Sequence, residues 1–110
     1  MTIEQIEKVD GLGIDVQAGE AVLVISDHLS WQDEAEHFSY LENKIGNYVN
    51  FIKSGQMLEI LPNARGLSTK IKLVHEHQPT ANAERILAAV KKQLKDIEIT
   101  FAYEALPDSY

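Results

Sequence analysis

The chain has no cysteine, no long apolar run and few basic residues. The absence of cysteine excludes disulfides, thiolate catalysis and cysteine-ligated zinc. No stretch reaches the ~20 apolar residues of a membrane-spanning helix. Residues 1–8 have neither the basic region nor the apolar core of a secretory signal. We therefore expect a cytoplasmic protein without a membrane partner.

The scarcity of basic residues gives the chain a marked acidic charge. It has 10 basic and 17 acidic side chains, for a formal net charge of −7. Such a surface repels the phosphates of nucleic acids and anionic lipids, which excludes both as expected partners. The charge suits simple solubility or a basic protein partner.

Length and composition predict one globular domain over residues 1–110, with a core from about 8 to 104 and a frayed tail at 105–110. Of the 110 residues, 45% are apolar and 25% are charged, as in ordinary globular proteins. A chain of this size buries enough surface on folding to form one core.

The first half of the chain predicts a hairpin followed by a long helix. Two extended runs, 8–15 and 20–27, flank a turn at 16–19. The stretch 21–25 is apolar on both faces, which predicts an interior strand. Ser30 is the expected N-cap of a helix over 31–54, and Gly55 is the residue expected to end it.

This helix has an unusually wide apolar face. At helical spacing one apolar stripe is joined by a second, and together they comprise Trp31, Phe38, Tyr40, Leu41, Ile45, Tyr48, Val49, Phe51 and Ile52. A helix packed on a sheet needs an apolar face only about 100° wide, and this face is wider. We expect the extra rings, Tyr40 and Phe51, to be covered by a second copy of the chain or by the segment 57–61, which we expect to be a short extended piece.

The second half predicts strand, helix and strand. Residues 69–77 alternate as in a strand, a helix runs from Thr80 or Asn82 to about Lys95, and 97–104 alternate again. The order β-β-α-β-α-β predicts an α+β two-layer sandwich, in which a mostly antiparallel four-stranded sheet has both helices on one face. The last β-α-β unit could instead be parallel.

Polar residues concentrate where the second strand meets the first helix. Asp27, His28, Glu34 and His37 lie there, and Glu34 and His37 have a spacing that lets them reach toward one point on a helix. A metal-assisted site is one interpretation. A serine–histidine–aspartate arrangement is less favoured, because Asp27 faces away from its neighbours in a strand. The simpler alternative is that these groups satisfy backbone amides at the junction.

Aromatic residues of the long helix form the other candidate site. Trp31, Tyr40 and Phe51 could be rigid anchors for a protein partner, ringed by acids. The alternative is that these rings belong to the core. No cofactor is expected, because Gly11-Leu12-Gly13 lacks the third glycine of a dinucleotide-binding fingerprint and precedes a strand.

Three segments resemble a family of small bacterial proteins catalogued as a domain of unknown function. They are Val24–Trp31, Lys44–Gly55 and Pro62–Gly66, within a likeness from about Asp10 to Tyr103. The chain departs from the family pattern at Gly46 and Lys53, where asparagine and an acid are more usual. The resemblance implies a bacterial cytosolic protein and assigns no activity or site residue.

The preferred hypothesis is a non-enzymatic interaction module that binds a protein partner or forms a homodimer through Tyr40 and Phe51. One alternative is a metal-assisted enzyme with its site at residues 27–37. The other is an acidic inhibitor or immunity-type protein that masks a basic enzyme. The sequence leaves open whether His28, His37, His75 and His77 converge.

Overall fold

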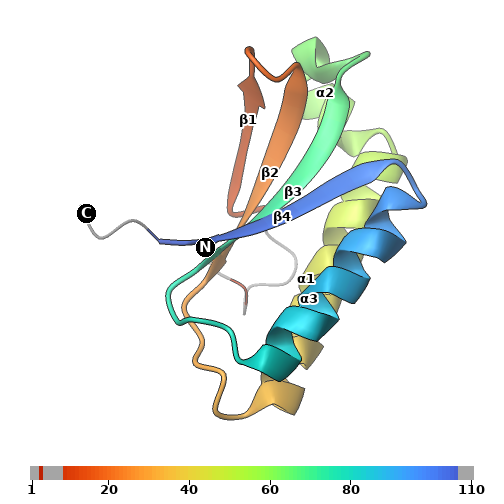
Figure 1. The fold of residues 1–110 in the computed structure, drawn as a ribbon. Helices are drawn as coiled ribbons and strands as arrows, with labels where there is room; N and C mark the ends of the chain where they lie inside the picture. The colour runs from red at the N-terminus through yellow and green to blue at the C-terminus, as the bar shows by residue number, and fades with distance from the viewer. Residues whose placement is uncertain (1–2, 4–8, 107–110) are drawn as a thin grey trace.

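The structure is a computed structural model that describes Ile3 and residues 9–106. Four strands form one sheet in the order β1-β2-β3-β4: β1 (Gly11–Asp15), β2 (Glu20–Asp27), β3 (Ser68–His75) and β4 (Ile99–Ala105). The helical segments are α1 (Glu34–Lys53), α2 (Gln56–Ile60), a 3₁₀ turn (Pro62–Ala64) and α3 (Ala81–Lys95). The two long helices, α1 and α3, lie on the same side of the sheet (Figure 1).

The sheet is mixed, so the prediction of a mostly antiparallel sheet is wrong. Strand β1 is antiparallel to β2, whereas β3 is parallel to β2 and β4 is parallel to β3. The physical reason is that each of the last two connections contains a long helix. Helices α1 and α3 return the chain to the end of the sheet at which the previous strand began, so the next strand runs parallel to it. The predicted α+β class is confirmed. The structure has one short helix, α2, in addition to the two helices that were predicted.

One face of the sheet carries the core. Residues of β2, and those of β3 from 70 to 75, alternate so that one set is buried beneath the helices and the other set is more exposed: the buried set is Ala21, Leu23, Ile25, Asp27, Ile71, Leu73 and His75. Strand β2 lies between β1 and β3, which confirms it as an interior strand. Its second apolar set, Val22 and Val24, is only half-buried on the opposite face.

Helix α1 begins later than its sequence predicts. The N-cap is Asp33, whose carboxylate accepts a hydrogen bond from the Glu36 amide at 3.1 Å. The prediction of Ser30 as the cap and Trp31 as the first helical residue is therefore wrong. Both residues have other partners, described below, that hold them in the loop before the helix. Gly55 ends α1 as predicted, with a left-handed φ of 86° that suits glycine.

The segment after α1 forms the short helix α2 and not an extended piece. Its residues are good helix formers, and Gly55 separates it from α1. Met57 is buried in the same apolar cluster as Phe51, which agrees with the expected intramolecular cover for that ring. Tyr40 lies at the other end of α1, far from α2 along the helix, and stays half-buried.

The strand ends differ from their predicted positions by a few residues. Strand β3 ends at His75, and the exposed His77 lies beyond it. Strand β4 begins at Ile99 because Glu98 turns the chain with a φ of 63°. At its other end β4 includes Ala105, and the Leu106 amide donates to the His75 carbonyl at 2.8 Å, so the predicted tail begins too early. The rest of that tail, 107–110, and Lys8 lie outside the described residues.

Candidate functional site

The junction between β2 and α1 contains a buried pair of ionisable side chains. Oδ2 of Asp27 lies 2.5 Å from Nε2 of His37, and both side chains are almost completely buried. Asp27 is the last residue of β2 and points toward the helices, and His37 lies in the first turn of α1. The structure therefore brings together two of the four predicted polar residues.

The hydrogen bonds of His37 define how protons are distributed in this pair. Nδ1 of His37 lies 2.9 Å from the Ser30 carbonyl oxygen, which can only accept, so Nδ1 carries a hydrogen. Nε2 then faces a carboxylate oxygen at 2.5 Å, a contact that also requires a hydrogen between the two atoms.

The Trp31 ring and the Leu29 amide surround the Asp27–His37 pair. The Trp31 ring stacks on the His37 ring at 3.6 Å between centroids, and its Nε1 donates to the His77 carbonyl at 3.1 Å. The second oxygen of Asp27 accepts from the Leu29 amide at 3.1 Å. Both ring nitrogens of His37 are occupied, so the pair has little capacity left to act on a substrate. This arrangement favours the interpretation that the junction residues satisfy backbone groups.

The other two predicted junction residues do not join this pair. The Glu34 carboxylate accepts from Thr80 Oγ1 at 2.8 Å and from Asn82 Nδ2 at 2.6 Å, and so ties α1 to the start of α3. These hydrogen bonds lower the pKa of the Glu34 carboxyl, and the bond from Asn82 has the larger effect. His28 is exposed. Across Ile3 and residues 9–106, no group of three or more histidine, aspartate and glutamate side chains could hold a metal ion.

The four histidines differ in burial, and they form no metal-holding group among the described residues. His75 is buried and is the register partner of Asp27 in the neighbouring strand, with its ring 6.2 Å from that of Tyr103. Its Nδ1 forms no hydrogen bond with the described residues. His28 and His77 are exposed, so only His37 and His75 lie in the interior.

A second buried ion pair was missed by the sequence analysis. Nζ of Lys44 donates to Oδ1 of Asp10 at 2.8 Å, with side-chain exposures of 0% and 1%. The other Asp10 oxygen accepts from the Ser26 amide at 2.9 Å, beyond the last β1–β2 pair at Gly11. The available signal was Lys44 itself, a charged residue within the apolar face of the helix, because an unpaired lysine is almost never fully buried.

Tyr48 completes this network from the next turn of α1. Its hydroxyl donates to the Val24 carbonyl at 2.5 Å and accepts from the Asp10 amide at 2.8 Å. Burial raises the pKa of the Tyr48 phenol well above its usual value. Lys44 and Tyr48 therefore attach α1 to the sheet at the point where β1 begins.

The predicted aromatic anchors are largely internal. Trp31 and Phe51 have exposed fractions of only 6% and 7%. Tyr40 is half-buried and lines a small hollow of about 190 Å³ together with His37 and Leu29. The role of these three residues in binding a partner stays a prediction. Tyr40 is the most exposed of the three.

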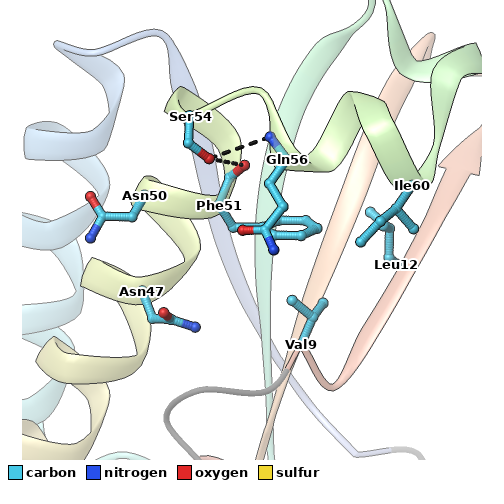
Figure 2. Close-up of a pocket in the computed structure, with 8 residues that line it drawn as sticks. All are labelled: Val9, Leu12, Asn47, Asn50, Phe51, Ser54, Gln56 and Ile60. Atoms are coloured by element: carbon cyan, nitrogen blue, oxygen red, sulfur yellow. Dashed lines mark hydrogen bonds between the residues drawn. The ribbon is translucent and has the colours of Figure 1, made fainter.

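A larger cavity of about 600 Å³ lies at the opposite end of α1, between α1, α2 and β1 (Figure 2). We call it the carboxamide groove. Its lining contains no charged residue and consists of Val9, Leu12, Asn47, Asn50, Phe51, Ser54, Gln56 and Ile60. The Gln56 side chain extends over the Phe51 ring, and Asn47 extends toward the same space (Figure 2).

The polar groups of the carboxamide groove differ from those of the interior because some have no partner. Within the part of the chain that the structure describes, the side-chain amides of Asn47 and Gln56 form no hydrogen bond. Each amide has two donor hydrogens and an acceptor oxygen available. Sequence analysis missed this groove because its wall on β1 is distant in sequence from its wall on α1 and α2.

Over residues 1–107 the sequence matches the family of unknown function DUF6572, and the chain belongs to that family. This confirms the resemblance inferred from the junction and helix segments. No curated protein and no solved structure matches the chain. No helix among the described residues is long and apolar enough to cross a membrane.

Proposed function

We propose that this chain is a non-enzymatic protein-binding module of a bacterial cytosol and that the carboxamide groove is its binding site. The observation that carries the proposal is the pair of unpaired side-chain amides, Asn47 and Gln56, beside an apolar floor. Ligand sites commonly combine an apolar surface with a few polar groups that fix orientation.

The chemistry of the groove suits a polypeptide segment. Asn47 and Gln56 can donate to backbone carbonyls of a partner and accept from its backbone amides. Val9, Leu12 and Ile60 can contact an apolar side chain of that segment. A lining of amides and apolar groups does not provide the positive charge that a phosphate or carboxylate ligand needs.

Charge supports a partner with basic residues next to its contact segment. The groove lining is uncharged, whereas the chain as a whole carries a net charge of −7. A partner is therefore favoured if its central residues are uncharged and its flanks are basic. The hypothesis of an acidic inhibitor or immunity-type protein for a basic enzyme is a special case of this proposal.

The metal-assisted alternative has less support. Its proposed centre would need Asp27 or His28 with Glu34 and His37, but Glu34 bonds to α3 while His37 bonds to Asp27 and Ser30. The Asp27–His37 pair is also enclosed and fully hydrogen-bonded. We therefore place the function in the groove and not at the junction.

Selection from a display library of short random peptides flanked by lysines tests this proposal. The peptides selected on the wild-type chain are measured by calorimetry on a double variant, Asn47→Ala with Gln56→Ala. The loss of about two hydrogen bonds predicts roughly tenfold or greater weakening. Gln93→Ala, an exposed amide on α3, is the matched control and should bind as the wild type does.

Two results would contradict the proposal. One is that no peptide is enriched on the folded wild-type chain. The other is that the enriched peptides bind the double variant and the Gln93→Ala control equally well, because the groove amides would then play no part.

A further inference from the structure

The outer edge of β1 borders the carboxamide groove. In the order β1-β2-β3-β4, and among Ile3 and residues 9–106, the first strand pairs only with β2 (Figure 1). Leu12, the second residue of β1, lines the groove. Natural edge strands often carry lysine or proline, which prevent the addition of another strand. The sequence of β1, Gly11-Leu12-Gly13-Ile14-Asp15, contains neither.

The direction of the backbone groups of β2 can be derived from its end. The Ser26 amide donates to Asp10, and the Ser26 carbonyl accepts from the Ile3 amide at 2.9 Å, both on the β1 side of the sheet. Backbone groups of alternate residues in a strand point to the same side. Those of Val24 and Val22 therefore also point toward β1.

The register then decides which backbone groups of β1 face outward. Gly11 and Gly13 are opposite Val24 and Val22, so their N–H and C=O groups point toward β2. Those of Leu12 and Ile14 consequently point away from the sheet. The open edge thus presents two donor–acceptor pairs with strand spacing, and one of these residues, Leu12, lines the same cavity as the amides of Asn47 and Gln56.

Side chains of an added strand would have space on both faces of the sheet. Those on the helix side would lie against Leu12 and enter the groove. Those on the other side would lie next to Gly13, where a shallow hollow of about 380 Å³ includes Val22 and Val24. A Cβ built on Gly13 meets no atom within 4 Å. Aromatic side chains on a neighbouring strand commonly cover such edge glycines.

We infer that the partner segment binds as an additional β-strand along the outer edge of β1, with alternate side chains in the carboxamide groove and over Gly13. This inference rests on the proposed function. The segment is an extended, uncharged stretch of a protein, with an apolar residue toward the groove and an aromatic residue toward Gly13. A lysine at one flank would lie near the exposed Asp15 at the end of β1.

Amide hydrogen exchange measured by NMR tests this inference, with a synthetic lysine-flanked peptide of alternating valine, threonine and phenylalanine as the probe. Saturating the wild-type chain should slow exchange at Leu12 and Ile14 by about tenfold or more, because both amides gain a partner. The Gly13 amide, which faces β2, is the internal control and should change little.

A pair of variants provides a second measurement. Ile14→Pro removes one outward N–H, a change that edge strands tolerate, and should weaken peptide binding roughly five- to tenfold. Ile14→Ala shortens the same side chain but keeps the N–H, and should retain more of the affinity. Far-ultraviolet circular dichroism and the exchange of the Gly13 amide establish that each variant keeps the sheet.

Three outcomes would overturn the inference. If the peptide binds and requires Asn47 and Gln56, but Leu12 and Ile14 stay unprotected, the groove binds a segment that does not extend the sheet. If Leu12 and Ile14 are already protected in the free chain and lose protection on dilution, a second copy occupies the edge. If no lysine-flanked peptide binds, the proposed function fails together with this inference.

Discussion

The two ends of α1 contain polar side chains in opposite circumstances. At the N-terminal end, His37 uses both ring nitrogens, toward Asp27 and the Ser30 carbonyl, beneath the Trp31 ring. At the C-terminal end, the amides of Asn47 and Gln56 border an open cavity and have no partner among the described residues. The first arrangement stabilises the fold, and the second is available to another molecule.

This contrast between the two ends of α1 indicates which end is the better place to look for a function. The polar residues of the junction drew attention in the sequence as a candidate metal-assisted or catalytic site. Here Asp27 and His37, and likewise Asp10 and Lys44, are paired within the chain. Their pairing predicts large losses of stability on substitution. The groove amides predict small losses of stability and large losses of binding.

The largest effect is expected in the middle of α1. Replacing Lys44 with alanine leaves the buried Asp10 carboxylate without its ion-pair partner, and should lower the free energy of unfolding by about 3–5 kcal/mol. Urea denaturation followed by circular dichroism measures the change. Lys91→Ala, which replaces an exposed lysine within α3, is the matched control and should stay within about 0.5 kcal/mol of the wild type. A loss in Lys44→Ala no larger than that of the control would show that the buried ion pair does not support the fold.

His37→Ala is expected to have the next largest effect. It leaves Asp27 buried with a single amide donor and removes the ring on which Trp31 stacks, so it should cost about 2–3 kcal/mol. Trp31 is the only tryptophan, and its fluorescence therefore reports directly on the junction. The exposed His77→Ala is the control. Unchanged emission and stability in His37→Ala would contradict the structural role assigned to the pair.

Tyr48 should make stability depend on alkaline pH. Its pKa is raised in the folded chain by burial, so the folded state retains a proton that the unfolded state loses above about pH 10. Its contribution is complete below that pH and declines as the pH rises further.

Ultraviolet titration should therefore show one of the four tyrosines ionising only when the chain unfolds. Tyr48→Phe should remove this late ionisation and cost about 1–2 kcal/mol, through the lost hydrogen bonds to Val24 and Asp10. Ordinary titration of all four tyrosines in the folded chain would refute the prediction.

The smallest effect on stability is expected in the groove. Asn47→Ala and Gln56→Ala should each change the free energy of unfolding by less than about 0.5 kcal/mol, because neither amide bonds to the described chain and alanine favours the helix. Thermal unfolding with calorimetry measures this. A loss above about 1 kcal/mol would erase the contrast between the two ends of α1, since the groove amides would then support the fold.

Local patterns in the sequence determined most of the elements. The hairpin, the interior position of β2, the Gly55 helix end and the presence of α3 follow from turn residues, alternation and caps, and Thr80 is one of the two residues expected to cap α3. These signals operate within a few residues, so one sequence suffices to interpret them. The wide apolar face of α1 also carried real information, since Phe51 and Tyr48 are in the core.

Only the tertiary structure decided how these elements combine. The direction of β3 and β4 depends on the end of the sheet to which α1 and α3 return the chain, and no local sequence pattern predicts that end. The Asp27–His37 and Asp10–Lys44 pairs join residues 10 and 34 positions apart, and Trp31 enters a loop because His77 provides its partner. The sequence alone therefore determined most of the elements and their core faces. Packing decided which polar groups are satisfied within the chain, and it left the groove amides and the outer edge of β1 without a partner among the residues that the structure describes.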